Sequence, residues 1–138
     1  FIRILTGLIA PESGRLLLNG VEVNGAQSQA YRDLFSAIFS DFYLFKKLYG
    51  YYEISDEEVD GWLKKLELPE RVNFASHAFT DLNLSTGQKK RIALIVSILE
   101  RRPIIILDEC QDMNIIYFEM VCKIYKDNNN INAKFCIF

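Results

Sequence analysis

Residues 84–109, LSTGQKKRIALIVSILERRPIIILDE, decide the fold of this chain. The stretch begins with a polar turn, in which Ser85 and Gln88 match the Ser-x-x-Gln capping box of a helix start. Gly87, inside the first turn, lets another molecule come close to the backbone. Because a helix start has free N–H groups and a positive dipole end, it favours a phosphate. The turn therefore predicts a helix whose N-terminus can contact an anion.

An amphipathic helix and a buried strand come after that turn. Apolar residues recur at helical spacing between Ile92 and Leu99, and Pro103 is expected to end the helix. The β-branched run at 104–107 is typical of a strand buried on both faces of a parallel sheet. These patterns predict an α/β fold.

Two acids, Asp108 and Glu109, directly follow the expected strand. Ligands of open α/β sheets bind beyond the carboxyl ends of the strands, so both side chains would lie in a ligand-binding position. Adjacent buried carboxylates are costly without a partner, which favours a cation between them and the ligand. Mg²⁺ held by one carboxylate and by substrate phosphates would fit. The second acid would then orient and deprotonate an attacking water.

Composition restricts the classes of protein to which the chain can belong. Its 138 residues suit one domain or part of one, with an ordinary globular balance of 50% hydrophobic and 25% charged residues. A net charge of −2 without a basic stripe argues against nucleic-acid binding. The cysteines lack Cys-x-x-Cys spacing and neighbouring histidines, which predicts reduced thiols rather than a metal site: Cys110, Cys122 and Cys136. The chain starts at Phe1, inside an apolar helical pattern, and we expect it to be a fragment.

Two of these motifs resemble those of one enzyme family. LSTGQ at 84–88 resembles the LSGGQ signature of ATP-binding cassette (ABC) ATPases, and IIILDE at 104–109 resembles their Walker B strand with its catalytic glutamate. The order of the two motifs and their short separation also match that family. Thr86 replaces a signature glycine, a variant that one exporter branch of the family tolerates. The resemblance implies an α/β fold, a partial P-loop NTPase-type ABC ATPase core with an inserted helical subdomain.

The resemblance divides the chain into three parts. Residues 1–45 would form a partial nucleotide-binding core: the helix after the phosphate-binding loop, ending near Leu8, a hairpin turning at Asn19-Gly20 (type I′), and the Q-loop region. Residues 46–83 would form the helical subdomain, in which Asp56 caps a helix with an apolar stripe from Val59 to Leu66. Residues 84–138 would contain the signature helix, the Walker B strand and a degenerate C-terminal part of the core.

Several motifs of the family are missing or altered. The Gly-Lys-Ser/Thr phosphate loop (Walker A) would lie just before Phe1, and no switch histidine follows Walker B; His77, the single histidine, precedes the signature and is expected to be a loop residue. Asp112 is the candidate for the D-loop aspartate. Beyond it, periodicity predicts a helix over 117–125 and a strand from 135 to 138.

The aromatic-rich segment 31–45 is expected to be a core strand and loop packed by Phe35, Phe39, Phe42 and Phe45. In the ABC family this region contains the Q-loop glutamine, and here Ser40-Asp41 takes its place. Serine is too short to reach a metal and a water as glutamine does, so Ser40 would act through water or not at all. The segment FSDFYLF at 39–45 resembles the corresponding segment of the branch that exports cyclic peptides and siderophore precursors.

The resemblance implies an ATP- and Mg²⁺-dependent exporter subunit. Two nucleotide-binding domains, here a homodimer, would sandwich ATP, so that one copy's signature contacts the γ-phosphate held by the other. Asp108 would hold Mg²⁺, and Glu109 would polarise the attacking water. The remaining cofactor-binding candidates are Ser40, Asp41, Ser85, Thr86, Gly87 and Gln88.

The implied partner is a transmembrane domain, fused upstream, which would place the chain at the cytoplasmic face of the inner (plasma) membrane. Exposed members of the group Tyr49, Tyr51 and Tyr52 are candidates for that contact. Two alternatives stay open: a soluble ABC ATPase of the DNA-repair or ribosome-associated type, and a degenerate cassette that does no catalysis. With no Walker A loop, the 138 residues alone are expected not to hydrolyse ATP.

Overall fold

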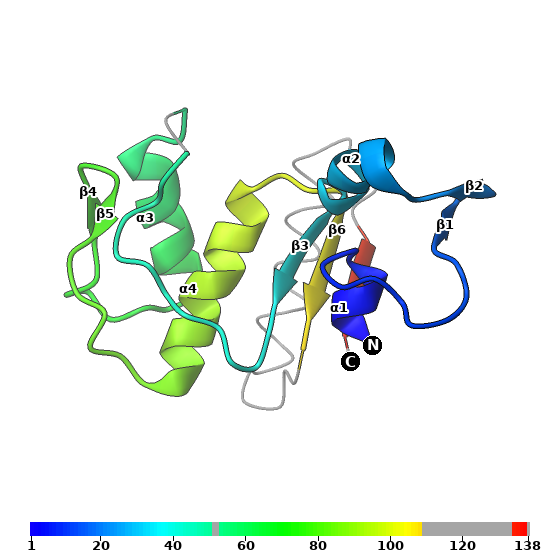
Figure 1. Cartoon of the computed structure of the whole chain (residues 1–138). Helices are drawn as coiled ribbons and strands as arrows, with labels where there is room; N and C mark the ends of the chain where they lie inside the picture. The colour runs from blue at the N-terminus through cyan, green and yellow to red at the C-terminus, as the bar shows by residue number, and fades with distance from the viewer. Residues whose placement is uncertain (51–52, 109–133, 138) are drawn as a thin grey trace.

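A parallel sheet forms the centre of the molecule. The computed structural model describes residues 1–50, 53–108 and 134–137. Within them, β3 (Phe35–Ile38), β6 (Ile104–Leu107) and β7 (Lys134–Ile137) pair in the order β3-β6-β7, and both pairings are parallel (Figure 1). Ile105 and Ile106 point to opposite faces of β6, and both are fully buried. The predicted strand buried on both faces is therefore confirmed, as is a strand beginning near Phe135.

A helical layer packs against this sheet. Helix α4 (Thr86–Leu99) contacts β3, and α3 (Asp56–Lys65) packs against α4. The predicted stripe of α4 is largely buried, with Ile92 and Ile95 fully inaccessible. Helix α4 ends at Leu99, before the predicted stop at Pro103. Arg101 then adopts a left-handed conformation with φ of 53°. The proline stop was therefore predicted too late.

The stretch predicted as a helical subdomain, 46–83, contains α3 and a short hairpin, β4 (Phe74–Ala75) and β5 (Ala78–Phe79). The predicted apolar stripe of α3 is buried, but its cap was predicted wrongly. Ser55 is the N-cap, and its side chain accepts a hydrogen bond from the Glu58 amide. The Asp56 carboxylate instead accepts a 3.0 Å hydrogen bond from the backbone amide of Ser76, in the turn of the hairpin. His77 lies in the same hairpin turn, as expected.

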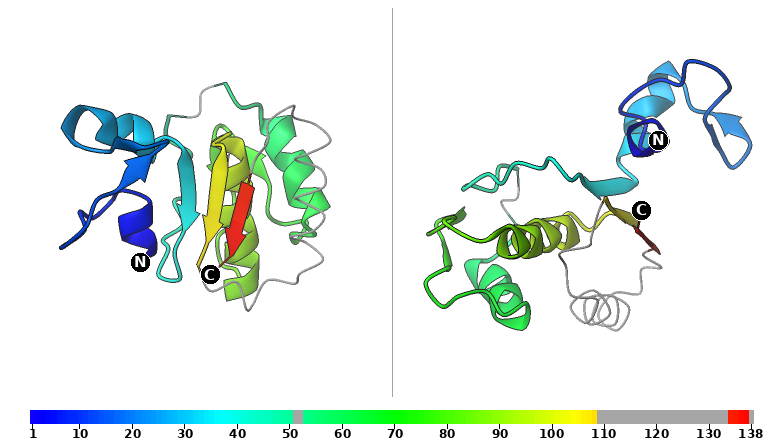
Figure 2. Two further views of the ribbon diagram at one scale, coloured as in Figure 1. Left: turned by 90° about the vertical axis from the view of Figure 1, so that its right-hand side faces the viewer. Right: turned by 90° about the horizontal axis from the view of Figure 1, so that it is seen from below.

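The N-terminal elements lie beyond the β3 edge of the sheet (Figure 2). They are α1 (Ile2–Leu5), β1 (Leu17–Leu18), β2 (Val21–Glu22), η1 (Gly25–Gln27) and α2 (Ser28–Arg32). Asn19 and Gly20 both have positive φ, of 51° and 82°, as the predicted type I′ turn between β1 and β2 requires. Helix α1 is shorter than predicted: it ends at Leu5, and Leu8 is exposed.

Packing between α1 and α2 explains why the first helix stops. Gly7 has φ of 72°, and a Cβ there would meet the Tyr31 ring at 3.1 Å. The Tyr31 hydroxyl donates a 2.7 Å hydrogen bond to the Leu5 carbonyl, and burial raises the pKa of this phenol. The chain therefore turns at Gly7 so that Tyr31 can close over the end of α1.

The aromatic segment after α2 is only partly in the core. Phe42 packs against the core cluster, as predicted. Phe35 and Phe39 are half-buried and lie outside that cluster: Phe35 stacks edge-to-face on Tyr31, and Phe39 lies under the Arg3 guanidinium. Phe45 is 63% exposed, so its predicted core position is wrong. It instead meets Tyr43 edge-to-face at the surface, with ring centroids 5.1 Å apart. The helix predicted over 117–125 and Asp112 lie outside the described residues.

Candidate nucleotide-binding site

A hollow of about 590 Å³ lies where β3 and β6 end. The register pairs Ile38 with Leu107, the last residues of the two strands, and the Asp108 amide donates to the Ile38 carbonyl at 2.9 Å. Because the strands are parallel, the residues after both of them emerge at one edge of the sheet. The hollow is lined by Phe1, Ile2, Arg3, Ile4, Ile9, Phe39, Ser40, Asp41 and Asp108. Three sequence-predicted site residues, Ser40, Asp41 and Asp108, are therefore brought together.

The charges around this hollow come from two carboxylates and one guanidinium. Asp41 is 70% exposed and forms a 3.2 Å ion pair with Arg3, whose guanidinium also lies over the Phe39 ring. Asp108 is half-buried, and its side chain makes no hydrogen bond or ion pair with any residue that the structure describes. A half-buried carboxylate without a protein partner is suited to a cation. The Asp108 side chain thus fits the predicted role of a Mg²⁺ ligand.

The number of ligands also fits magnesium better than a metal enclosed by protein. Over residues 1–50, 53–108 and 134–137, no three His, Cys, Asp or Glu side chains gather as a metal-binding group. Mg²⁺ is commonly held by one or two carboxylates, with the remaining positions filled by water and substrate phosphates. Asp108, on the lining of a hollow open to water and to a substrate, suits that arrangement. Glu109, the predicted catalytic acid, lies outside the described residues.

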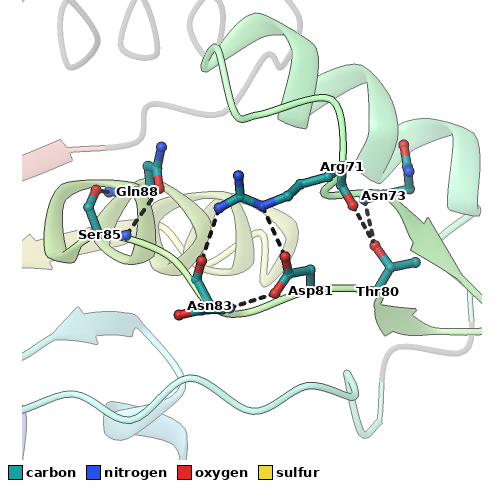
Figure 3. Close-up of polar contacts among 7 residues, drawn as sticks. All are labelled: Arg71, Asn73, Thr80, Asp81, Asn83, Ser85 and Gln88. Atoms are coloured by element: carbon teal, nitrogen blue, oxygen red, sulfur yellow. Dashed lines mark hydrogen bonds and ion pairs between the residues drawn. The ribbon is translucent and has the colours of Figure 1, made fainter.

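The predicted signature turn begins α4 with a complete capping box (Figure 3). The Gln88 amide donates to Ser85 Oγ at 3.3 Å, and the Ser85 amide donates to Gln88 Oε1 at 3.0 Å. Ser85 and Thr86 are exposed, while Gly87 and Gln88 are half-buried. The start of α4 and the end of β6 lie at the same end of the molecule in Figure 1. None of these four residues lines the hollow around Asp108, so one copy does not bring the two predicted halves of the site together.

With that geometry established, comparisons with known proteins identify the family. The sequence profile of the ABC transporter family matches residues 1–112 of the 138. The chain belongs to the ABC transporter family. The predicted family and the partial P-loop NTPase-type core are therefore confirmed, and membership implies that this ABC domain binds nucleotide.

Curated ABC proteins resemble the chain over most of its length. It is 42% identical over 111 residues to the ATP-binding protein SyrD of Pseudomonas syringae pv. syringae, covering 78% of this chain and 20% of that protein. It is 30% identical over 119 residues to the glutathione/L-cysteine transport system ATP-binding/permease protein CydD of Bacillus subtilis, covering 78% and 21%. The chain spans about a fifth of the length of these relatives.

Solved ABC structures share the fold. A bacterial Atm1-family ABC exporter with ATP bound superposes with a TM-score of 0.73 at 21% identity, over 99% of this chain and 26% of that one. The cbiO1 component of the Clostridium perfringens cbiONQ transporter gives 0.60 at 19% identity, over 99% and 59%. None of the helices in the described part of the chain is long and apolar enough to cross a membrane.

A second hollow of this ABC domain lies on the side of the sheet that α4 covers. It measures about 390 Å³ and lies between the segment after β3 and helix α4. Its rim holds large exposed aromatic side chains: Tyr43, Phe45 and Tyr49 are 78%, 63% and 69% exposed. Of the predicted tyrosine group, Tyr49 is therefore exposed, whereas Tyr51 and Tyr52 lie outside the described residues. Exposed aromatic clusters of this kind are typical of interaction surfaces.

Sequence reasoning missed Arg3. Its partner Asp41 is 38 positions away, and no local pattern links the two residues. One signal was present, because Arg3 is the only charged residue among the first eleven, in an otherwise apolar run. A lone charge in such a run points to a polar partner or to solvent, and here Arg3 has both.

Proposed function

We propose that this chain is part of the ATP-hydrolysing domain of an ABC exporter, and that it powers export of a peptide or siderophore-type substrate. The observation that supports ATP hydrolysis best is the half-buried carboxylate of Asp108, which has no partner among the described residues and lies in a hollow at the carboxyl edge of a parallel sheet. The proposal of a peptide or siderophore-type substrate rests on the sequence Ser40-Asp41-Phe42 in the Q-loop region.

The residues at the carboxyl edge of the sheet would have different roles in ATP hydrolysis. Asp108 holds Mg²⁺, which when bound neutralises phosphate charge. Glu109, the next residue, orients the attacking water and accepts its proton. Ser40 and Asp41 lie on the rim of the same hollow, and Arg3 holds Asp41 in place through their ion pair. Ser40 reaches the nucleotide through a water, because its side chain is short.

The signature turn would act across a dimer. The start of α4 lies at the same end of the molecule as the end of β6. The four residues of the turn do not line the hollow around Asp108: Ser85, Thr86, Gly87 and Gln88. A second copy in head-to-tail orientation brings its own turn to the γ-phosphate, where helix N–H groups favour an anion. Binding of ATP then closes the two copies, and hydrolysis opens them.

The transmembrane partner would dock on the aromatic rim of Tyr43, Phe45 and Tyr49. We propose that this partner is fused upstream in the same polypeptide and holds the chain at the cytoplasmic face of the inner (plasma) membrane. The name of CydD, an ATP-binding/permease protein 30% identical to this chain, supports a fused arrangement.

The experiment is magnesium-dependent ATP turnover by the complete polypeptide that contains this chain. We expect Glu109→Gln and Asp108→Asn each to lower kcat by at least about a hundredfold, since each removes a group that acts in the transition state. Glu22→Gln, an exposed acid on β2, serves as the matched control and should not change the rate. The 138 residues alone, which contain no Gly-Lys-Ser/Thr loop, are expected to show no turnover.

Two results would contradict this function. Magnesium-independent turnover, or turnover that survives Glu109→Gln, would remove the assigned chemistry. No turnover by the complete wild-type polypeptide would instead favour the degenerate, non-catalytic cassette.

A further inference from the structure

One arginine ties together the segment that leads into the signature helix (Figure 3). Arg71 Nε donates to the Asp81 carboxylate at 3.0 Å, and its Nη2 donates to the Asn83 carbonyl at 3.0 Å. The Asn83 amide in turn donates to Asp81 Oδ1 at 2.7 Å. One guanidinium therefore bonds two positions of the loop that ends at the helix cap Ser85.

The backbone of Arg71 belongs to the same clamp. Thr80 Oγ1 donates to the Arg71 carbonyl at 3.1 Å, and the Asn73 amide donates back to Thr80 Oγ1 at 3.0 Å. The Thr80 amide donates to the Asn73 carbonyl at 2.9 Å. These bonds join two segments, 71–73 and 80–83, immediately before the signature turn. We call the set Arg71, Asn73, Thr80, Asp81 and Asn83 the Arg71 clamp.

The clamp restrains the polar positions of a loop whose Leu84 belongs to the core cluster and whose Leu82 packs against it. Asn83, Ser85 and Thr86 are exposed, and the buried side chain next to them is Leu84. A loop of this kind samples many conformations unless specific bonds restrict it, and each restricted residue removes conformational entropy in advance of binding. Fixing Asn83 two residues before Ser85 therefore fixes the direction from which the chain enters α4. That direction determines where the first helical amides point.

We propose that Arg71 is a positioning residue for the signature turn: through Asp81 and Asn83 it holds the amides that start at Ser85 in the orientation that receives the phosphate. This inference rests on the proposed function, because the phosphate is that of ATP held by the second copy. Arg71 itself touches no nucleotide. Its guanidinium has the two-pronged geometry that a lysine ammonium lacks, so an arginine bonds both loop positions at once.

The test compares ATPase kinetics of the complete polypeptide with Arg71 replaced. Arg71→Gln is expected to raise the KM for ATP about threefold to tenfold, the range for loss of exposed charge-assisted bonds, with a smaller effect on kcat. Arg71→Lys keeps the charge but loses one of the two bonds, so its KM should fall between the KM of the wild type and that of Arg71→Gln. A variant that merely folds poorly lowers the maximal rate by reducing the amount of active enzyme, and leaves KM unchanged.

Arg101→Gln is the matched control. Arg101 is 64% exposed, close to the 58% of Arg71, and forms a single ion pair with Glu58 of the helical subdomain at 3.8 Å. Among the described residues, Arg101 forms no hydrogen bond or ion pair with the segment before Ser85, and the KM of its variant should equal that of the wild type. Hydrogen exchange gives a second readout: amides of Ser85–Gln88 should exchange faster in Arg71→Gln than in Arg101→Gln.

The outcomes separate the inference from the function on which it rests. An active wild type whose KM and signature-turn exchange are the same in Arg71→Gln and Arg101→Gln would overturn the role of Arg71 alone. An inactive wild type would overturn the proposed function, and the exchange comparison would still decide whether the clamp orders the turn. If Arg71→Gln fails to fold, Arg71→Lys decides: a KM equal to wild type overturns the proposal.

Discussion

The carboxylate of Asp81 shows how one residue can respond to pH through its hydrogen bonds. The Asn83 amide holds the pKa of Asp81 below its ordinary 3.8, desolvation opposes this effect, and the positive charges of Arg71 and Lys46 add to it. The charged form is therefore favoured in the folded protein. Protonation would weaken both the Asn83 bond and the Arg71 ion pair.

This shift predicts a stability that depends on pH. Because the folded pKa of Asp81 is the lower one, its contribution is complete above the ordinary value near 3.8 and is lost as pH falls through the folded pKa. Wild type should exceed Asp81→Asn in unfolding free energy at about pH 6, and the gap should narrow below about pH 4. Urea unfolding of the complete polypeptide and of its Asp81→Asn variant across this pH range measures the difference in unfolding free energy. A gap that widens with acid would reverse the sign and contradict the assignment.

At the scale of elements, two helices begin with the same kind of cap but differ in a second hydrogen bond. Ser55 caps α3 and Ser85 caps α4, each accepting the amide three residues on. The cap of α4 also receives the reciprocal Gln88 bond. Helix α4 spans from the signature turn to the loop before β6, so it leads to the start of that strand and not to the edge that holds Asp108.

The two caps, Ser55 and Ser85, give a prediction in which one variant is the control for the other. Ser55→Ala and Ser85→Ala should each cost about 1 kcal/mol of stability, because each leaves a helix amide without its partner. Only Ser85→Ala should also raise the KM for ATP, since only that cap begins the proposed phosphate-binding turn. Chemical unfolding and ATPase kinetics on both variants test this. Equal KM values for the two would argue against nucleotide contact at the turn.

At the scale of the whole molecule, two surfaces face different proposed partners. The hollow at the sheet edge holds Asp41 and Asp108, and the second hollow is rimmed by exposed aromatics. The two hollows share β3 and the segment directly after it: Ile38 and Phe42 line the second hollow, and residues 39–41 line the first. Movement at one surface can therefore reach the other through elements that are packed together.

This arrangement predicts that transport and hydrolysis can be separated by mutation. Tyr43→Ala with Tyr49→Ala should reduce transport by the reconstituted polypeptide several-fold, because truncating aromatic anchors weakens docking. ATP turnover should change far less. Val21→Ala, an exposed apolar residue on the hairpin, is the control. Unaltered transport in the double variant would exclude this rim as the contact with the membrane domain.

Local sequence patterns were sufficient where the deciding contacts are close in the chain. The capping box joins Ser85 and Gln88, and the type I′ turn needs only Asn19 and Gly20. Patterns failed where a distant residue competed. Asp56 was predicted as a cap, but it binds the Ser76 amide 20 positions away, and Ser55 takes the cap. Phe45 is aromatic like Phe42, yet only the path of the chain after β3 decides which of them reaches the core.

The sequence by itself determined the signature helix, the buried strand and the acid at its end, because helix caps, periodicity and β-branching act over a few neighbouring residues. Tertiary structure alone decided that Ser40, Asp41 and Asp108 share one hollow, that Arg3 holds Asp41, and that Arg71 orders the approach to Ser85. Those arrangements depend on strand register and on contacts between residues 10 to 38 positions apart, where backbone paths rather than local preferences set which side chains meet.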